Sequence, residues 1–347
     1  MNINCRTFEL MNIVKTLGWI STLVVVISIS LGSCENELDL VAPYEEIGVI
    51  YGLINPTDSV HIVRIQKAFL GEGNALLMAQ NPDSIYYLDI LTAKLQRIKN
   101  GAVLEELPLS RYIGDPLNQG SGTFPTTPNI LYKTNSAKIY RDSDYRIIVT
   151  NNETGYEMRA TTPIIDSLII SRPTMDPTVA IPWAGQFPIT VEYTTGKDGK
   201  VFNLTIRFKY TEETIANGVI VDKYVDWVFP NKLVKDPDMP EIISLEVDGE
   251  DFYRFLGDAI KVDASVRRYA GTTDFIITSG AEFLADYINI NSATTSILTT
   301  IPEYTNIENG TGIFSCRYTQ VTPNKPLDAN SLNYLKTGPY TSDLGFQ

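Results

Sequence analysis

The sequence is poor in cysteine and histidine. In 347 residues it holds one histidine, His61, and three cysteines, Cys5, Cys34 and Cys316. So few nitrogen and sulfur ligands cannot supply the three or four that a zinc site needs. A Ser-His-Asp or Cys-His triad would have to use His61, which lies in an alternating apolar stretch typical of a strand. These absences argue against a zinc enzyme and against a hydrolase with a Ser-His-Asp or Cys-His triad. The sequence indicates no cofactor.

Long apolar runs are also lacking. The longest, residues 17–31, is shorter than the about 20 residues that span a bilayer, and serine and threonine dilute it. Arg6 and Lys15 precede this run and small residues end it, which is the organisation of a secretory signal peptide. Translation can start at Met1 or at Met11, because both leave an apolar leader.

The leader ends in Leu-Gly-Ser-Cys, residues 31–34. This segment resembles the lipobox of bacterial lipoproteins, in which the cysteine thiol is acylated and cleavage leaves it at the N-terminus. The resemblance implies a signal peptide over residues 1–33 and lipidation of Cys34. A plain signal peptide with a chance cysteine, or an N-terminal signal anchor, is the alternative.

Removal of the leader and acylation of Cys34 leave Cys316 as the remaining thiol. No intramolecular disulfide can then form, so the fold must be held by its own core. Cys316 alternates with its neighbours as a strand residue does. We therefore predict a small buried hydrophobe there rather than a nucleophile.

Basic residues are outnumbered. Without Arg6, Lys15 and Glu9 of the leader, the chain has 26 basic and 40 acidic residues, a net charge of −14. Such a field repels nucleic acid and anionic lipid headgroups, which argues against both as partners beyond the lipid anchor itself. Residues 34–43 form an acidic tether, whose start resembles the surface-export signal of Bacteroidota lipoproteins. An acidic tether that is solvated but carries no export signal is the alternative.

Strand-forming residues are abundant, with 19 tyrosines and 13 phenylalanines. The predicted fold class is mainly β, with an immunoglobulin-like β-sandwich over residues 44–163 and a strand-rich α+β domain over residues 164–347. The sandwich prediction rests on a hairpin signal at Asn100-Gly101 and on Tyr145. Tyr145 opens a strand after an aspartate-bearing turn, as in the tyrosine corner of such sandwiches.

The second half contains strand and helix signals. Strands at 189–193 and 201–210 are expected to pair with each other across the turn 197–199. Apolar residues at helical spacing predict a helix over 249–260, and a second helix is expected over 281–288. These helices among strands give the α+β prediction. In the first half, a short helix is expected at 74–80, before Asn81-Pro82.

Four segments together carry a resemblance to a family: the lipobox at Cys34, the strand 48–56, its partner 60–67 and the closing segment 305–314. They resemble an uncharacterised family of Bacteroidota outer-membrane lipoproteins, a domain of unknown function often encoded beside TonB-dependent receptors. The resemblance implies a lipid-anchored, surface-facing outer-membrane protein that binds or gates a substrate for a TonB-dependent transporter. The lack of a catalytic constellation favours a role without catalysis. A structural or adhesive role in surface assembly is the first alternative.

Three aromatic residues are candidates for ligand contact. Trp183, Tyr224 and Trp227 can form a platform on which sugars or peptides stack. Packing in the core or between domains is the alternative for these rings.

Carboxylates give two weaker candidates. Oxygen ligands for calcium are offered by Asp236, Asp238, Asp248, Glu250 and Asp251, although none of these follows the EF-hand pattern. A carboxylate-dependent hydrolase is the second alternative function, since a glycosidase needs only two suitably spaced acids. Its candidate acids are Glu250, Asp251, Asp258 and Asp226. Solvated surface charge is the alternative for all of these residues.

We expect the substitution Cys34→Ala to abolish lipid attachment, because the thiol is the acceptor of the acyl-bearing group. Cells fed labelled palmitate should label the parent protein and leave the variant unlabelled. Globomycin, which blocks the lipoprotein signal peptidase, should enlarge the parent protein by its uncleaved leader. Equal labelling of parent and variant would contradict the anchor.

Overall fold

The computed structural model describes residues 46–68, 79–115, 128–234, 236–292 and 304–347. The predicted leader, the tether and Cys34 lie outside these residues, as does most of the helix expected at 74–80. The fold is mainly β, as predicted. Within the described residues, no helix is both long enough and apolar enough to cross a membrane.

One sheet of 12 strands contains most of the strands in the described part of the chain. Its order is β11-β10-β14-β15-β1-β2-β5-β4-β3-β6-β7, and β12 pairs with β10 off this path. The bounds of its strands are β1 Gly48–Ile54, β2 Ile62–Lys67, β3 Leu91–Lys99, β4 Ala102–Gly114, β5 Asn129–Thr134, β6 Asp144–Asn151, β7 Glu157–Thr162, β10 Val201–Thr214, β11 Ile220–Val228, β12 Lys232–Leu233, β14 Val266–Gly280 and β15 Gly310–Pro326.

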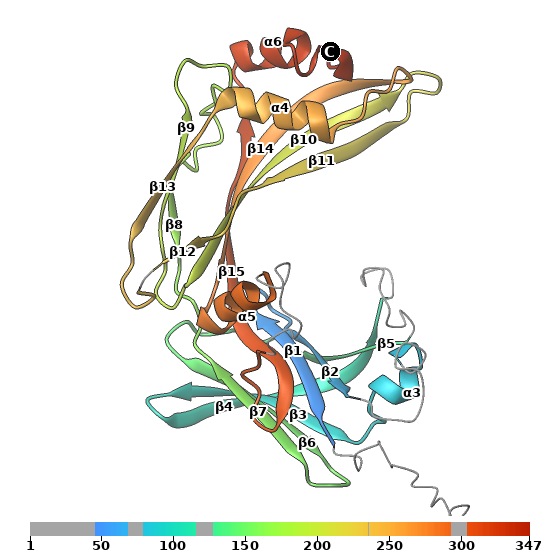
Figure 1. Cartoon of the computed structure of the whole chain (residues 1–347), viewed down its shortest axis with the longest axis vertical. Helices are drawn as coiled ribbons and strands as arrows, with labels where there is room; N and C mark the ends of the chain where they lie inside the picture. The colour runs from blue at the N-terminus through green and yellow to red at the C-terminus, as the bar shows by residue number, and fades with distance from the viewer. Residues whose placement is uncertain (1–45, 69–78, 116–127, 235, 293–303) are drawn as a thin grey trace, which may run out of the picture. The chain divides into compact units, whose positions relative to one another are not determined.

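A second, antiparallel sheet has three strands in the order β13-β9-β8. Its strands are β8 Ile169–Arg172, β9 Ile189–Thr194 and β13 Ile242–Val247. The helices between and after the strands are α3 Pro82–Ile85, α4 Gly249–Ala259, α5 Glu282–Ser292, α6 Ala329–Thr337 and the short 3-10 helix η3 Ser342–Leu344. Figure 1 shows α4 lying across β14, β10 and β11.

The long strand β15 belongs to both parts of the large sheet. Its residues 310–316 pair in parallel with β1, and its residues 317–326 pair antiparallel with β14. At 17 residues it exceeds the usual strand length of about 3 to 10 residues. The chain before residue 163 and the chain after it therefore share one sheet through this strand (Figure 1).

An immunoglobulin-like sandwich over residues 44–163 is not confirmed. That fold has two separate facing sheets, whereas strands β1 to β7 form one continuous hydrogen-bonded series. The series continues until β7 meets the segment before β15, where Glu308 donates its N–H to the carbonyl of Arg159 at 2.8 Å. Periodicity identifies strands and their buried faces but does not say how many sheets the strands form.

The turn and the buried tyrosine predicted for this first half are confirmed. Asn100 and Gly101, with φ values of 52° and 79°, form the turn between β3 and β4. Tyr145 opens β6 with its side chain fully buried, and its hydroxyl accepts the N–H of Tyr140 at 3.1 Å. A buried tyrosine hydroxyl that bonds the backbone a few residues upstream is the feature that Tyr145 was expected to supply.

The expected pairing of 189–193 with 201–210 is wrong. β9 pairs with β8 on one edge and with β13 on the other, so no edge remains for β10. β10 instead lies between β14 and β11 in the large sheet. The segment between β9 and β10 does turn, with Asp198 at φ 64°. The sequence marked the turn but not the partner of each strand.

Helix α4 confirms the helix predicted for 249–260. Asp248 precedes it and accepts the N–H of Glu250 at 2.7 Å, which satisfies one of the free donors of the first turn. Its apolar face buries Phe252 and Leu256 against the sheet. Trp183 stacks on Phe252, with ring centroids 4.0 Å apart. This aromatic packing, rather than a disulfide, anchors the helix.

Gly312 marks a close approach of two backbones. Its φ is 107°, and a Cβ at this position would lie 2.1 Å from the carbonyl oxygen of Ile50, its neighbour on β1. Gly218 also has a positive φ, 68°, but nothing lies within 4 Å of its would-be Cβ.

We expect Gly312→Ala to lower the free energy of unfolding by about 3 kcal/mol or more, because strain and a clash add, and Gly218→Ala to lower it by about 1 kcal/mol. Urea denaturation of the two variants measures the difference. Equal losses would contradict the close contact between β15 and β1.

Candidate functional site

The three aromatic candidates do not lie together. Trp183 is 1% exposed and stacks between Phe252 and Phe275, so it is a core residue that no ligand in solvent can reach. Trp227 stacks on Phe255 of α4, with centroids 5.5 Å apart. Tyr224 is 57% exposed. Tyr224 and Trp227 are three positions apart on β11, so they point to opposite faces of the sheet.

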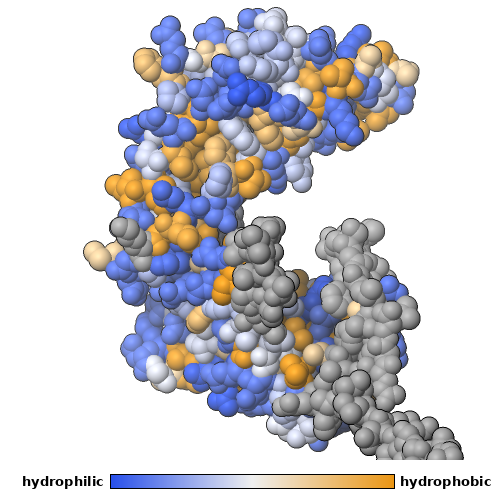
Figure 2. All heavy atoms as spheres, in the orientation of Figure 1, coloured by the Kyte–Doolittle hydropathy of each residue, from blue (hydrophilic) through white to orange (hydrophobic). Residues whose placement is uncertain are grey.

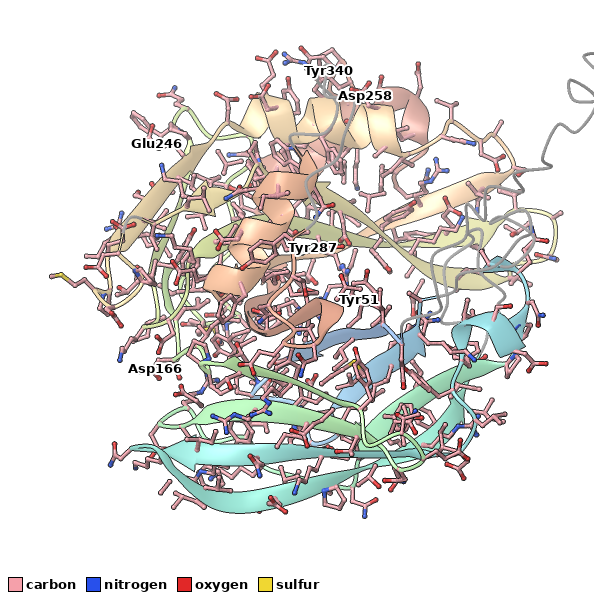
Figure 3. All side chains as sticks on the ribbon, turned by 60° about the horizontal axis from the view of Figure 1, so that its bottom comes forward. Tyr51, Asp166, Glu246, Asp258, Tyr287 and Tyr340 are labelled. Atoms are coloured by element: carbon pink, nitrogen blue, oxygen red, sulfur yellow. The ribbon has the colours of Figure 1, made fainter. Side chains whose placement is uncertain are left out.

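The carboxylates at the start of α4 serve the helix. Asp248 caps it, as described above. Glu250 and Asp251 each contact Arg254 at 2.9 Å, and Tyr340 donates its hydroxyl to Glu250 at 2.6 Å. Asp258 lies further along the helix (Figure 3). Asp248, Glu250 and Asp251 therefore all have partners within the protein.

The other calcium candidates are also dispersed. Asp236 accepts the N–H of Asp238 at 3.0 Å, and the carboxylate of Asp238 lies 3.6 Å from the ammonium of Lys197. Across the described residues, no group of three or more histidine, cysteine, aspartate or glutamate side chains has a geometry that could hold a metal ion.

Two β-bulges interrupt the large sheet side by side. Between β10 and β14, Lys209 lies opposite two residues, Gly271 and Thr272. Between β14 and β15, Asp274 lies opposite two residues, Pro323 and Asn324. A bulge bends its strand and redirects the neighbouring side chains, and bulges are frequent beside binding sites.

Each bulge depends on its residue type. A Cβ on Gly271 would lie 2.6 Å from the carbonyl oxygen of Lys209, so glycine allows the strands to approach. Asn324 adopts a φ of 57°, a conformation that asparagine tolerates better than most residues. Residues held in such sparsely populated conformations cluster at functional sites.

The carboxylate of Asp274 connects the two bulges. Its Oδ1 lies 2.8 Å from Nζ of Lys209 and accepts the N–H of Asn324 at 2.7 Å. Nζ of Lys209 also donates to Oδ1 of Asn324 at 2.7 Å. Asp274 is only 9% exposed, and hydrogen bonds to a charged group are the stronger ones. Three strands are thereby joined through one carboxylate.

Beside this connection, a second ion pair holds the exposed tyrosine. Arg207 donates Nε–H and an Nη2–H to the two oxygens of Asp226, at 2.7 and 2.8 Å. The same guanidinium lies 4.1 Å from the ring centroid of Tyr224. A cation over an aromatic ring is attracted to its face, so Arg207 fixes the orientation of Tyr224. Both oxygens of Asp226 are therefore bonded to Arg207.

A pocket of about 550 Å³ lies among these groups. This size falls within the range of small-molecule clefts, roughly 300 to 1,000 Å³. The residues that line it include Lys209, Thr211, Asp222, Tyr224, Thr272 and Asn324, and also Lys223, whose ammonium pairs with Glu212. Because Tyr224 and Trp227 point to opposite faces, the pocket lies on the sheet face away from α4. Tyr224 is the predicted site residue that the structure places here.

The sequence also carries signals for the two β-bulges beside the pocket. A glycine inside a strand pattern, as at Gly271, indicates a bulge or a close backbone approach. The pair Pro323-Asn324 inside the last strand is a turn signal in a place where no turn is expected. The partnership of Asp274 with Lys209 had no sequence signal, because the two residues are 65 positions apart.

A second cavity, of about 440 Å³, lies beside the β3–β4 turn and the turn after β9. Two of its charged groups pair with each other: Lys99 contacts Asp142 at 2.5 Å, and this hydrogen bond lowers the pKa of Asp142 to about 2. Burial raises the pKa of Asp198 at the same cavity. No aromatic ring lines it. The first pocket is therefore the better candidate for ligand binding.

Neither His61 nor Cys316 forms part of either cavity. His61 is 3% exposed, and burial lowers its pKa, so the ring is neutral at pH 7. Cys316 is fully buried, as predicted; burial raises the pKa of its thiol to about 12. A thiol with that pKa stays protonated and is a poor nucleophile.

Comparisons with known proteins give little. No family model matches the sequence, and no curated protein matches it. Among solved structures, the C-terminal globular domain of an oligosaccharyltransferase from Pyrococcus abyssi is similar with a TM-score of 0.23 and 11% identity, over 65% of this chain and 47% of that chain. This chain thus spans about half the length of that structure. A likeness at this score carries no argument about fold or function.

We expect Asp274→Asn to destabilise the protein by about 2 kcal/mol, because it keeps the shape but leaves Lys209 and the Asn324 N–H with a weaker partner. The matched control is Glu106→Gln, which removes the exposed partner of Lys94 and should leave the free energy of unfolding almost unchanged. Chemical denaturation measures both variants. If the two variants unfold alike, Asp274 does not connect the bulges.

Proposed function

We propose that this protein is a lipid-anchored outer-membrane lipoprotein, facing the cell surface, that binds a substrate for a TonB-dependent transporter without chemical conversion. The observation that carries the binding role is the pocket beside Tyr224. An aromatic residue that is more than half exposed, held by Arg207 beside a pocket, is an arrangement suited to ligand contact.

The location rests on the sequence. Residues 31–34 resemble a lipobox, and the acidic residues after Cys34 resemble a surface-export signal. The transporter partner rests on the resemblance of the strand and closing segments to lipoproteins encoded beside TonB-dependent receptors.

Binding without catalysis is favoured by how the acids on this face of the sheet are used. A glycosidase needs one carboxyl group that is protonated at working pH and a second carboxylate nearby. Asp226 is bound to Arg207 and Asp274 to Lys209, so both carboxylates already have cationic partners. Among the described residues that line the pocket, Asp222 carries the one carboxylate.

A role in surface assembly is the second candidate, and one observation favours it. Ile169 and Ile242 are 65% and 70% exposed and flank Thr194 in the small sheet. Figure 2 shows hydrophobic residues gathered over this part of the molecule. Exposed apolar groups of this kind mark contact with another protein when they form a large patch.

We expect a tagged copy, purified from native membranes in mild detergent, to bring down a TonB-dependent receptor in stoichiometric amount. The variant Cys34→Ala, which lacks the anchor, should recover much less receptor, because the two proteins no longer share the membrane surface. Mass spectrometry of the eluate identifies the partner.

Purification of the tagged protein alone, or only with further copies of itself, would contradict the transporter role. Self-association that is lost on Ile242→Ser would support the assembly role instead.

A further inference from the structure

We infer that the pocket beside Tyr224 binds an uncharged carbohydrate, with one sugar ring stacked on the tyrosine. This inference rests on the proposed function, because it names the ligand class of the same pocket. Three properties of the pocket favour such a ligand: its charge balance, its unused hydrogen-bonding groups and its exposed aromatic ring.

Four charges on this face cancel in two pairs. Arg207 neutralises Asp226 and Lys209 neutralises Asp274. An anionic ligand would meet the carboxylate of Asp222 and the net negative field of the chain. A cationic ligand would compete for the ring of Tyr224 with the guanidinium of Arg207, which already lies over it. A neutral ligand avoids both penalties.

Several polar groups of the pocket have no protein partner within the described residues. The carboxylate of Asp222 and the hydroxyls of Thr211 and Thr272 are of this kind. Oδ1 of Asn324 accepts from Lys209, so the amide NH₂ of Asn324 is left to donate. The set mixes acceptors, donors and hydroxyls. Neighbouring hydroxyl groups of a sugar, each both donor and acceptor, satisfy such a mixed set.

The tyrosine supplies the apolar contact. One face of a sugar ring exposes mainly C–H groups, which pack against an aromatic ring. Tyr224 remains 57% exposed although Arg207 lies against it, so a large part of its ring is open to a ligand. The volume of about 550 Å³ has room for one or two sugar units.

An extended peptide is the less suitable ligand. Peptides that bind to a sheet in extended form pair with the backbone of an edge strand. The groups of this pocket are side chains on the face of the sheet, contributed by β10, β11, β14 and β15. The free backbone edge of β11, the outermost strand, lies beside this face rather than on it.

The test uses the full mature lipoprotein in a detergent without a sugar headgroup. A microarray carries neutral oligosaccharides, charged oligosaccharides from heparin and polygalacturonate, and a set of random peptides. Binding should concentrate on neutral oligosaccharides, and calorimetry with the best of them gives the affinity. Preference for charged sugars or peptides, or no binding to any probe, would overturn the inference.

Four variants test the assignment of the pocket. Tyr224→Ala should weaken binding roughly tenfold and Asp222→Asn severalfold, because they remove the stacking ring and the acceptor. Tyr224→Phe keeps the ring and should bind almost as the parent does. The control is Tyr51→Ala, which removes another exposed tyrosine, on β1 (Figure 3).

Undiminished affinity of Tyr224→Ala would place the sugar elsewhere. The outcomes remain separate from those for the proposed function. If no sugar binds, the receptor can still co-purify with the protein. If no receptor co-purifies, the protein can still bind a sugar.

Discussion

At Asp274, one carboxylate joins three strands at the point where two β-bulges meet. It pairs with Lys209 on one side and accepts the backbone N–H of Asn324 on the other. A bulge leaves backbone groups out of the regular ladder, and buried polar groups must find other partners. Here the compensating carboxylate lies at the bulges themselves and has a partner on each side. The pocket exists because this irregularity is stable.

The two faces of the C-terminal strands have different roles. Alternation along β11 places Trp227 against α4 and Tyr224 on the opposite face. The covered face is apolar and aromatic, and it holds Trp183 and Phe252. The opposite face carries ion pairs and the exposed ring. A sheet buried on one side by a helix leaves its other side available for recognition, and the rigid core behind it limits the cost of ordering the site on binding.

Local features were predictable because they depend on nearby residues. The β3–β4 turn at Asn100-Gly101, helix α4 and the burial of Cys316 all follow from short patterns. The partners of β9 and the single series of strands from β1 to β7 do not, since pairing depends on contacts far apart in the chain. Tyr224 was found by residue type alone. Its setting was not, because β-bulges and the bond between Lys209 and Asp274 arise only when strands align.

A double-mutant cycle between Lys209 and Asp274 tests most directly whether this connection holds the site together. Unfolding free energies are measured for the parent, Lys209→Met, Asp274→Asn and the double variant. The structure predicts a coupling of about 1 to 3 kcal/mol, because each group satisfies the other in a shielded position. A coupling near zero would mean that the two residues act independently, and that the bulges are held by something else.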